Sequence, residues 1–272
     1  MGLFFKKRNV KPIFVGSYGN NMTRGMYVFH LDIDNGEILK KKFYKSLANP
    51  TALFKRERFI YVCYKNHTGK KTDGGLWQYA TMDLQFGLAG KATCQGKTYM
   101  SCFVNENRDF AYAVDYYNGE VVTIAILKQK IVKVTQTIKH EGHGLDSKRQ
   151  SEAHPHFIEQ TPDQKRMFVC DLGTDEVVLY KVGEKGRLER DEENSFQLAP
   201  GSGPKKMIFT PDGKYAYVLN ELSNTVCVYS YQDCQFTFIQ EIDTYPKDEY
   251  TKESLAGDIV ISEKGDYLFV SN

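Results

Sequence analysis

The sequence has almost no excess of charge of either sign: 36 lysines and arginines face 34 acidic residues, and the net charge at pH 7 is +2. A protein that attracts nucleic acid or an anionic membrane surface over a distance needs a clear excess of positive charge. Long apolar runs are also missing, and no stretch approaches the ~20 residues that a membrane-spanning helix requires. We therefore expect neither nucleic acid nor a membrane among its partners.

A secretory leader is not visible either. Only Leu3, Phe4 and Phe5 precede Lys6 as an apolar stretch, which is too short for the apolar part of a signal peptide. The six cysteines form no Cys-x-x-Cys motif, and several lie in apolar segments that are typical of strands. They predict buried free thiols in a reducing compartment, so we expect the protein in the cytoplasm.

Motifs of the common catalytic and cofactor sites are absent as well. There is no Gly-x-Ser-x-Gly nucleophile elbow, Walker motif or dinucleotide fingerprint. The segment His140-Glu141-Gly142-His143 falls in a predicted loop, whereas a zincin motif needs a helix, and the histidine spacing fits no common zinc site. The sequence therefore predicts no metal and no cofactor.

What the sequence does contain is a repeated hairpin unit. Short segments rich in Val, Ile, Tyr and Phe alternate with Gly and Pro turns, and none shows the spacing of an amphipathic helix. The clearest unit covers 201–229, with weaker copies at 160–180 and 105–124. All-β units of this length are typical of propeller blades, so the predicted fold class is an all-β propeller. One aromatic residue of the second strand recurs roughly every 50 residues, at Phe14, Tyr61, Tyr112, Phe168, Tyr217 and Phe269.

Several segments carry a family resemblance in the right order along the chain. They are Phe14-Val15-Gly16-Ser17-Tyr18, His154-Pro155-His156, Asp171-Leu172-Gly173 with Val177, the run from Gly201 to Val226, and Phe269-Val270-Ser271-Asn272. Over essentially its whole length the sequence resembles the lactonase family of seven-bladed propellers, which includes propeller-type 6-phosphogluconolactonases and carboxymuconate cyclases. Two departures stand out. Lys205-Lys206 occupy the place where the family usually has Arg, and the family's Ser-Asn-Arg segment stops here at Asn272.

The resemblance implies seven blades, which would need roughly 350 residues at the period of this repeat. The chain has 272 residues, and its last aromatic anchor is the sixth. We therefore expect residues 1–272 to form one propeller domain with about five complete blades and a partial sixth, truncated at the C-terminus by the last blade or blades. Such an open propeller exposes a strand edge, through which copies of the chain could associate.

The hairpin pattern also predicts where polar side chains meet. Because neighbouring strands of a blade are antiparallel, the start of the inner strand and the end of the second strand lie on the same face. His156 and Lys205 stand at the starts of successive inner strands, and Glu221 follows the second strand of the unit that contains Lys205. We expect these side chains to converge at one mouth of the central channel, with Arg149 and His154 beside them, and such convergence marks a candidate site.

The two predicted catalytic residues each have a structural alternative. His156 could act as general acid or base, since imidazole titrates near neutral pH, or it could be a hydrogen-bonded residue of the blade wall. Glu221 could orient His156 or activate water, or it could cap backbone amides in its turn. The resemblance implies that both residues belong to the active site of the family.

Three further residues are predicted to bind the substrate. Lys205 keeps the positive charge of the family's arginine but loses the bidentate fork. It could hold a phosphate, a carboxylate or the oxyanion of an opening lactone. Arg149 and His154 are additional candidates, although an arginine in a polar loop can equally be solvated.

The function implied by the resemblance is hydrolysis of a sugar lactone. The leading substrate is 6-phosphogluconolactone, converted to 6-phosphogluconate in the pentose phosphate pathway, so the expected partner is a small phosphorylated sugar lactone. No cofactor is needed, because opening a lactone requires only acid–base and electrostatic assistance. Two alternatives stay open: a muconate-type cycloisomerase that uses the same residues to move a proton to or from carbon, and a non-catalytic propeller that binds a partner.

Overall fold

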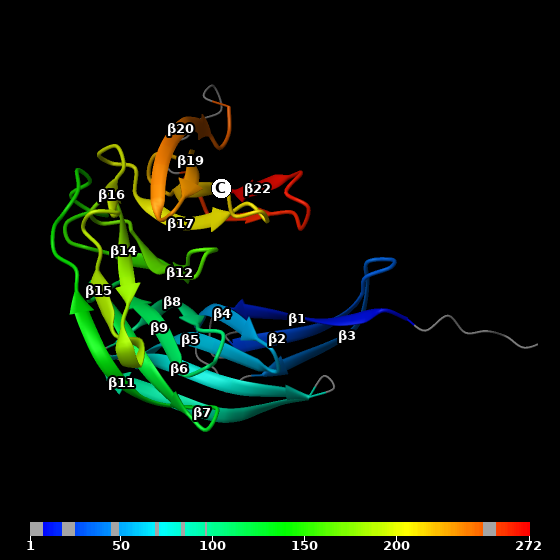
Figure 1. Cartoon of the computed structure of the whole chain (residues 1–272). Helices are drawn as coiled ribbons and strands as arrows, with labels where there is room; N and C mark the ends of the chain where they lie inside the picture. The colour runs from blue at the N-terminus through cyan, green and yellow to red at the C-terminus, as the bar shows by residue number, and fades with distance from the viewer. Residues whose placement is uncertain are drawn as a thin grey trace, which may run out of the picture. The chain divides into compact units, whose positions relative to one another are not determined.

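The computed structural model describes residues 8–17, 25–44, 49–68, 71–82, 85–95, 97–246 and 254–272. Within these residues the regular elements are strands, except for one single-turn 3-10 helix, η1 (Glu184–Gly186). The strands form six antiparallel sheets (Figure 1). By its internal contacts the chain divides into two compact units, Met1–Thr98 and Tyr99–Asn272.

The first unit contains two sheets. The strands of one sheet are β1 (Val10–Ser17), β2 (Gly25–Asp32) and β3 (Glu37–Tyr44), and those of the other are β4 (Pro50–Arg56), β5 (Phe59–Thr68), β6 (Lys71–Met82) and β7 (Gln85–Gln95). The two sheets share one apolar core, in which Met26 and Val28 of β2 join Ile60 and Val62 of β5. Each such side chain contributes roughly 1.5–3 kcal/mol when it is fully buried, so these strands stabilise the unit.

The second unit contains four sheets that follow one another along the chain. Their strands are β8 (Tyr99–Val104), β9 (Phe110–Asp115), β10 (Glu120–Leu127) and β11 (Lys130–Lys139); β12 (Pro155–Gln160), β13 (Arg166–Asp171), β14 (Glu176–Val182), β15 (Leu188–Arg190) and β16 (Phe196–Gln197); β17 (Pro204–Phe209), β18 (Tyr215–Asn220), β19 (Thr225–Gln232) and β20 (Gln235–Asp243); and β21 (Asp258–Ile261) and β22 (Leu268–Ser271). In each sheet the strands are paired in sequence order, apart from β15 and β16, which both pair with β14. This up-and-down pairing is the arrangement of a propeller blade.

Equivalent hairpin turns show that the sheets are copies of one unit. In the turn between β17 and β18, the hydroxyl of Thr210 donates to the carboxylate of Asp212 at 2.6 Å, and Gly213 has a φ of +71°. In the turn between β12 and β13, the hydroxyl of Thr161 makes the same bond to Asp163 at 2.7 Å. A side chain that bonds to its own turn fixes the hairpin locally, which explains why this segment recurs in the sequence.

Neighbouring sheets of the second unit pack through their apolar faces. One cluster joins Phe168 and Cys170 of β13 to Met207 of β17 and Val218 of β18, all fully buried. The alternation of the strands places these residues on one face of each sheet, as a blade that packs against its neighbour requires.

The all-β propeller fold predicted from the repeat is confirmed, and the six sheets agree with the expected number of blades. Four sheets have four or more strands, the first described sheet has three and the last has two. The aromatic anchors lie in the second strand of their sheets except Phe14, which lies in β1, the first strand of its sheet. Tyr61, Tyr112 and Phe168 are buried, whereas Phe269 is 57% exposed. That residues 1–272 form a single domain stays a prediction.

Two further expectations concern the cysteines and the membrane. Five cysteines are buried free thiols, and Cys94 lies among the residues whose side chains are not described. Within the described residues, no helix is long and apolar enough to cross a membrane.

Candidate active site

The predicted site residues lie in the second unit, and two of them, His156 and Lys205, stand at the starts of the inner strands β12 and β17. Along β12 the pairing with β13 shifts register between Pro155 and Phe157, and along β17 the pairing with β18 shifts between Pro204 and Lys206. The residues at the two bulges are His156 and Lys205. A bulge places one extra residue in a strand and re-aims its side chain, so the same local irregularity positions both residues.

Glu221 lies between two positive charges. Its Oε1 accepts a hydrogen bond from Nη2 of Arg149, and its Oε2 lies 2.6 Å from Nζ of Lys205. The carboxylate is only 5% exposed, whereas the side chains of Arg149 and Lys205 are 33% and 21% exposed. Burial alone would raise the pKa of Glu221, but the hydrogen bond and charge of Lys205, together with Arg149, lower it. Glu221 is therefore ionised at neutral pH.

The backbone around Glu221 is fixed by the loop that precedes β17. The amide of Glu221 donates to the carbonyl of Gly203 at 2.7 Å. Gly203 has a φ of +64°, and a Cβ at this position would lie 2.5 Å from Cγ of Leu222. Only glycine fits this close approach without strain, so the Gly-Ser-Gly-Pro segment serves to place Glu221 beside Lys205.

Arg149 lies in a polar loop that is tied down at both ends. The carboxylate of Asp146 accepts the amide of Arg149 at 3.1 Å, and the amide of Gln150 donates to the carbonyl of Asp146 at 2.7 Å. The side chain of Gln150 is fully buried and donates to the carbonyl of Leu172 and to Asp175. The loop therefore holds the arginine close to Glu221.

Asp175 connects this loop to the loop that carries Lys205. Its Oδ1 accepts hydrogen bonds from Nε2 of Gln150 and from the amide of Gly203, both at 2.7 Å. Its Oδ2 accepts the amide of Gly201, also at 2.7 Å. One buried carboxylate thus sets the position of both cationic side chains relative to each other.

His156 lies close to this charge cluster and is half-buried. Burial and the positive charge of Lys205 lower the pKa of His156 to about 4, although Glu221 acts in the opposite direction. Among the described residues, its ring makes no hydrogen bond to another side chain. The imidazole is therefore neutral at pH 7 and has a nitrogen lone pair available.

Tyr116 was not predicted from the sequence but contacts three of the predicted residues. Its ring stacks on His154 with centroids 4.3 Å apart and meets His156 edge-on at 5.8 Å. Burial raises the pKa of Tyr116, and the nearby guanidinium of Arg149 acts in the opposite direction, which places the hydroxyl close to that arginine. Tyr116 follows β9 directly, in the position that Glu221 occupies after β18, so the rule that selected Glu221 would also have found Tyr116.

His154 stacks on this tyrosine and is hydrogen-bonded to two neighbouring groups. Its Nδ1 donates to the carbonyl of Tyr116 at 2.9 Å, and its amide donates to Oδ1 of Asp171 at 2.7 Å. Asp171 in turn contacts Nδ1 of His140 at 2.7 Å, and Nε2 of His140 lies 2.5 Å from the hydroxyl of Tyr180. The structure therefore gives His154 buried supporting contacts, and its role in substrate binding stays a prediction.

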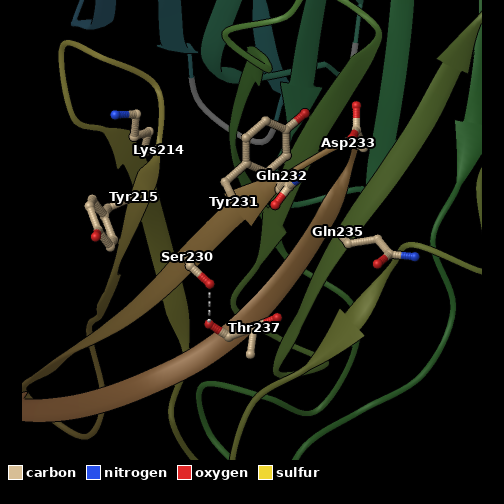
Figure 2. Close-up of a pocket in the computed structure, with 8 residues that line it drawn as sticks. All are labelled: Lys214, Tyr215, Ser230, Tyr231, Gln232, Asp233, Gln235 and Thr237. Atoms are coloured by element: carbon tan, nitrogen blue, oxygen red, sulfur yellow. Dashed lines mark hydrogen bonds between the residues drawn. The ribbon is translucent and has the colours of Figure 1, made fainter.

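Two other features lie apart from the cluster. Nζ of Lys206 pairs with Asp258 at 2.7 Å, so this lysine is engaged elsewhere. A surface pocket of about 670 Å³ is lined by residues of β18, β19, β20 and the adjoining turns, and Figure 2 shows its mainly polar side chains. None of the predicted site residues lines this pocket.

The cluster can bind an anion and move a proton. Arg149 and Lys205 supply two cations, and with the charge of Glu221 the group carries a net charge of +1. His156 supplies a neutral base, and Lys205 can also stabilise an oxyanion. These are the properties needed to open an ester or lactone.

Known proteins of similar sequence and fold match most of the chain. A family model described as "Lactonase, 7-bladed beta-propeller" matches residues 12–272. The uncharacterized protein YwcC of Lactococcus lactis is 32% identical over 268 residues, which cover 96% of this chain and 75% of that protein. The 6-phosphogluconolactonase of Bacillus subtilis is 28% identical over 267 residues, which cover 95% of this chain and 74% of that protein. A solved structure from Lactobacillus plantarum, 27% identical, superposes with a TM-score of 0.85 over 96% of this chain and 75% of that one.

Proposed function

Because the chain belongs to the lactonase family of seven-bladed β-propellers, we propose that it hydrolyses a sugar lactone, with 6-phosphogluconolactone as the substrate. The observation that carries the proposal is the meeting of Arg149, Lys205 and Glu221 beside the neutral ring of His156. A phosphorylated lactone has the two features that this cluster can use: an anionic group to bind and a carbonyl that becomes an oxyanion. The name of the Bacillus subtilis relative supports the same substrate.

In the proposed reaction, water attacks the carbonyl carbon of the lactone. His156 accepts a proton from the water, and the carbonyl oxygen develops negative charge beside Lys205. The bond between the carbonyl carbon and the ring oxygen then breaks, and the imidazolium returns the proton to the ring oxygen. The product is the open hydroxy acid, which is ionised at neutral pH. No oxidant, reductant or metal takes part.

Glu221 has a different task from His156 in this scheme. Both of its oxygens already bind cations, so it is a poor acceptor for the proton of the water. Its negative charge instead favours the imidazolium form of His156, since it acts against the burial and the cations that lower the pKa of that ring. Glu221 thus assists the proton transfer electrostatically.

The setting of the reaction follows from the proposed substrate. Hydrolysis of 6-phosphogluconolactone would place the protein in carbohydrate metabolism, in the pentose phosphate pathway of the cytoplasm. The buried free thiols fit a reducing compartment of this kind.

The test is hydrolysis of 6-phosphogluconolactone, measured as acid release and corrected for the spontaneous reaction. We expect His156→Ala to lower kcat by roughly 10²–10⁴-fold, the usual contribution of a general base. The exposed His143 gives a matched control, and His143→Ala should retain activity. Absence of acid release with the unmodified chain, or full activity of His156→Ala, would contradict the proposal.

A further inference from the structure

In the charge cluster, the carboxylate of Glu221 is fully engaged by cations of the protein. Each oxygen of Glu221 is taken by a different cation, Oε1 by Arg149 and Oε2 by Lys205. The anionic group of a substrate that binds here must therefore compete with a carboxylate of the protein itself. This competition affects the rate of proton transfer as well as the affinity, because the negative charge of Glu221 also favours the imidazolium form of His156.

The two cations are not held equally. Nζ of Lys205, which extends from β17, also donates to the carbonyl of Ala256 at 3.3 Å. Arg149 extends from a loop, and its side chain is the more exposed of the two, at 33% against 21%. Its long side chain can turn toward solvent while Asp146 and Gln150 keep the loop in place. Arg149 is therefore the cation that an incoming anion can move.

Phosphate is a stronger partner than carboxylate for a guanidinium. It carries more negative charge near neutral pH and matches the planar N–H fork, so arginine binds it through two parallel hydrogen bonds. The cluster carries a net charge of +1, which also favours the arrival of an anion. The anion would leave Glu221 with Lys205 as its only cationic partner.

We propose that Arg149 couples substrate recognition to catalysis: an anionic group on the substrate draws Arg149 from Glu221, and the released carboxylate then supports proton transfer to His156. This inference rests on the proposed function and names its specificity, since the preferred substrates are lactones that carry a phosphate or a carboxylate. A neutral lactone leaves Arg149 bound to Glu221, so it is hydrolysed with a lower kcat as well as a higher KM. A separate anion that occupies the same place restores part of the rate.

The experiment supplies the two parts of the substrate separately. Hydrolysis of glucono-δ-lactone is measured with and without added phosphite and corrected for the spontaneous reaction. We expect phosphite to raise kcat of the unmodified chain roughly tenfold, a fraction of the effect of a general base. Arg149→Met should raise the rate with glucono-δ-lactone alone, abolish the response to phosphite, and lower kcat/KM for 6-phosphogluconolactone. The matched control is Arg187→Met, which changes an exposed arginine outside the cluster and should leave all three values unchanged.

Two further measurements keep the outcomes distinct. Arg149→Lys keeps the charge without the fork and should show a weakened response to phosphite, which separates displacement of Arg149 from a simple folding defect. If the unmodified chain does not hydrolyse 6-phosphogluconolactone, the proposed function fails. If it hydrolyses this substrate, but phosphite has no effect and Arg149→Met does not speed hydrolysis of glucono-δ-lactone, then Arg149 binds the anion without releasing Glu221, and this inference is overturned.

Discussion

Replacing Asp175 by asparagine tests whether one buried carboxylate aligns the two cations of the site. The side chain is 4% exposed and accepts three hydrogen bonds, each of 2.7 Å. Two of them bind Oδ1, from Gln150 and Gly203, and one binds Oδ2, from Gly201. Asparagine has the same shape, so the substitution changes the charge and one acceptor without leaving a cavity.

The magnitude follows from those three bonds. The amide oxygen can still accept from Gln150 and Gly203, but its NH₂ group then faces the amide of Gly201, and the opposite orientation makes two such conflicts. Loss of one bond to a charged group costs about 1.5–3 kcal/mol. The φ of +57° at Asp175 adds no cost, because asparagine adopts this region readily. At about 2–4 °C per kcal/mol for a chain of this size, we expect Tm to fall by about 3–12 °C.

Thermal unfolding and lactone hydrolysis should be measured on the same preparation. Since Asp175 aligns the loops of Arg149 and Lys205, KM for 6-phosphogluconolactone should rise even at temperatures where the variant is folded. The control is Asp233→Asn, at a turn residue with a φ of +50° whose side chain is 77% exposed. Its ion pair with Lys165 lies on the surface and contributes at most about 1 kcal/mol. If the Tm of Asp175→Asn lies within about 1 °C of that of the unmodified chain, the carboxylate of Asp175 does not stabilise the folded state as its hydrogen bonds indicate.

Two other predictions concern Tyr116 and the dependence of stability on pH. Tyr116→Phe removes the hydroxyl beside Arg149 but keeps the ring stacked on His154, so KM for 6-phosphogluconolactone should rise roughly tenfold while Tm stays nearly constant. Tyr117→Phe is the control and should leave KM unchanged; an unchanged KM in Tyr116→Phe would mean that its hydroxyl does not position Arg149. His156 is protonated below about pH 6.5 in the unfolded chain but only near pH 4 in the folded one, so the unfolded state binds the extra proton and the free energy of unfolding falls as the pH drops from 6.5 to 4. The lowered pKa of Glu221 also makes the free energy of unfolding fall toward acid, but at lower pH. Denaturant titrations of His156→Gln should show a free energy of unfolding that depends less on pH between pH 6.5 and 4. An equally steep dependence would mean that His156 is not the group responsible.

The repeat made the fold predictable, since the residues of each hairpin turn determine the conformation of that turn. The Thr-Pro-Asp turns at Thr161 and Thr210 bond to themselves, so they form the same structure wherever they occur in the chain. Alternating apolar residues then decide which face of each sheet is buried. Phe14 did not follow the pattern because the sheet that contains it has β1 as its first strand. A local motif cannot report how many strands precede it in a sheet.

The site was less predictable because its partners come from distant parts of the chain. The antiparallel rule brought Glu221 and Lys205 together correctly, and the structure adds which oxygen of Glu221 meets which cation. Arg149 was named from the polar character of its loop alone, but its contact with Glu221 depends on the packing of Gln150 against Asp175. Such contacts, between residues far apart in sequence, leave no local pattern.

The bulges at the starts of the inner strands could not be predicted from the alternation of apolar and polar residues. In β4, β8, β12 and β17 the register shifts after the first residue, and the residues at the shift are Thr51, Met100, His156 and Lys205. Strict alternation would count these residues as one face of the strand and place every following side chain on the wrong side. The bulge restores the apolar face for the residues that follow it and adds one residue to each of these strands. Thr, Met, His and Lys occupy these added positions, so the fold accepts both polar and apolar side chains there. His156 and Lys205, the two that we predict to take part in the reaction, occupy equivalent places in consecutive sheets.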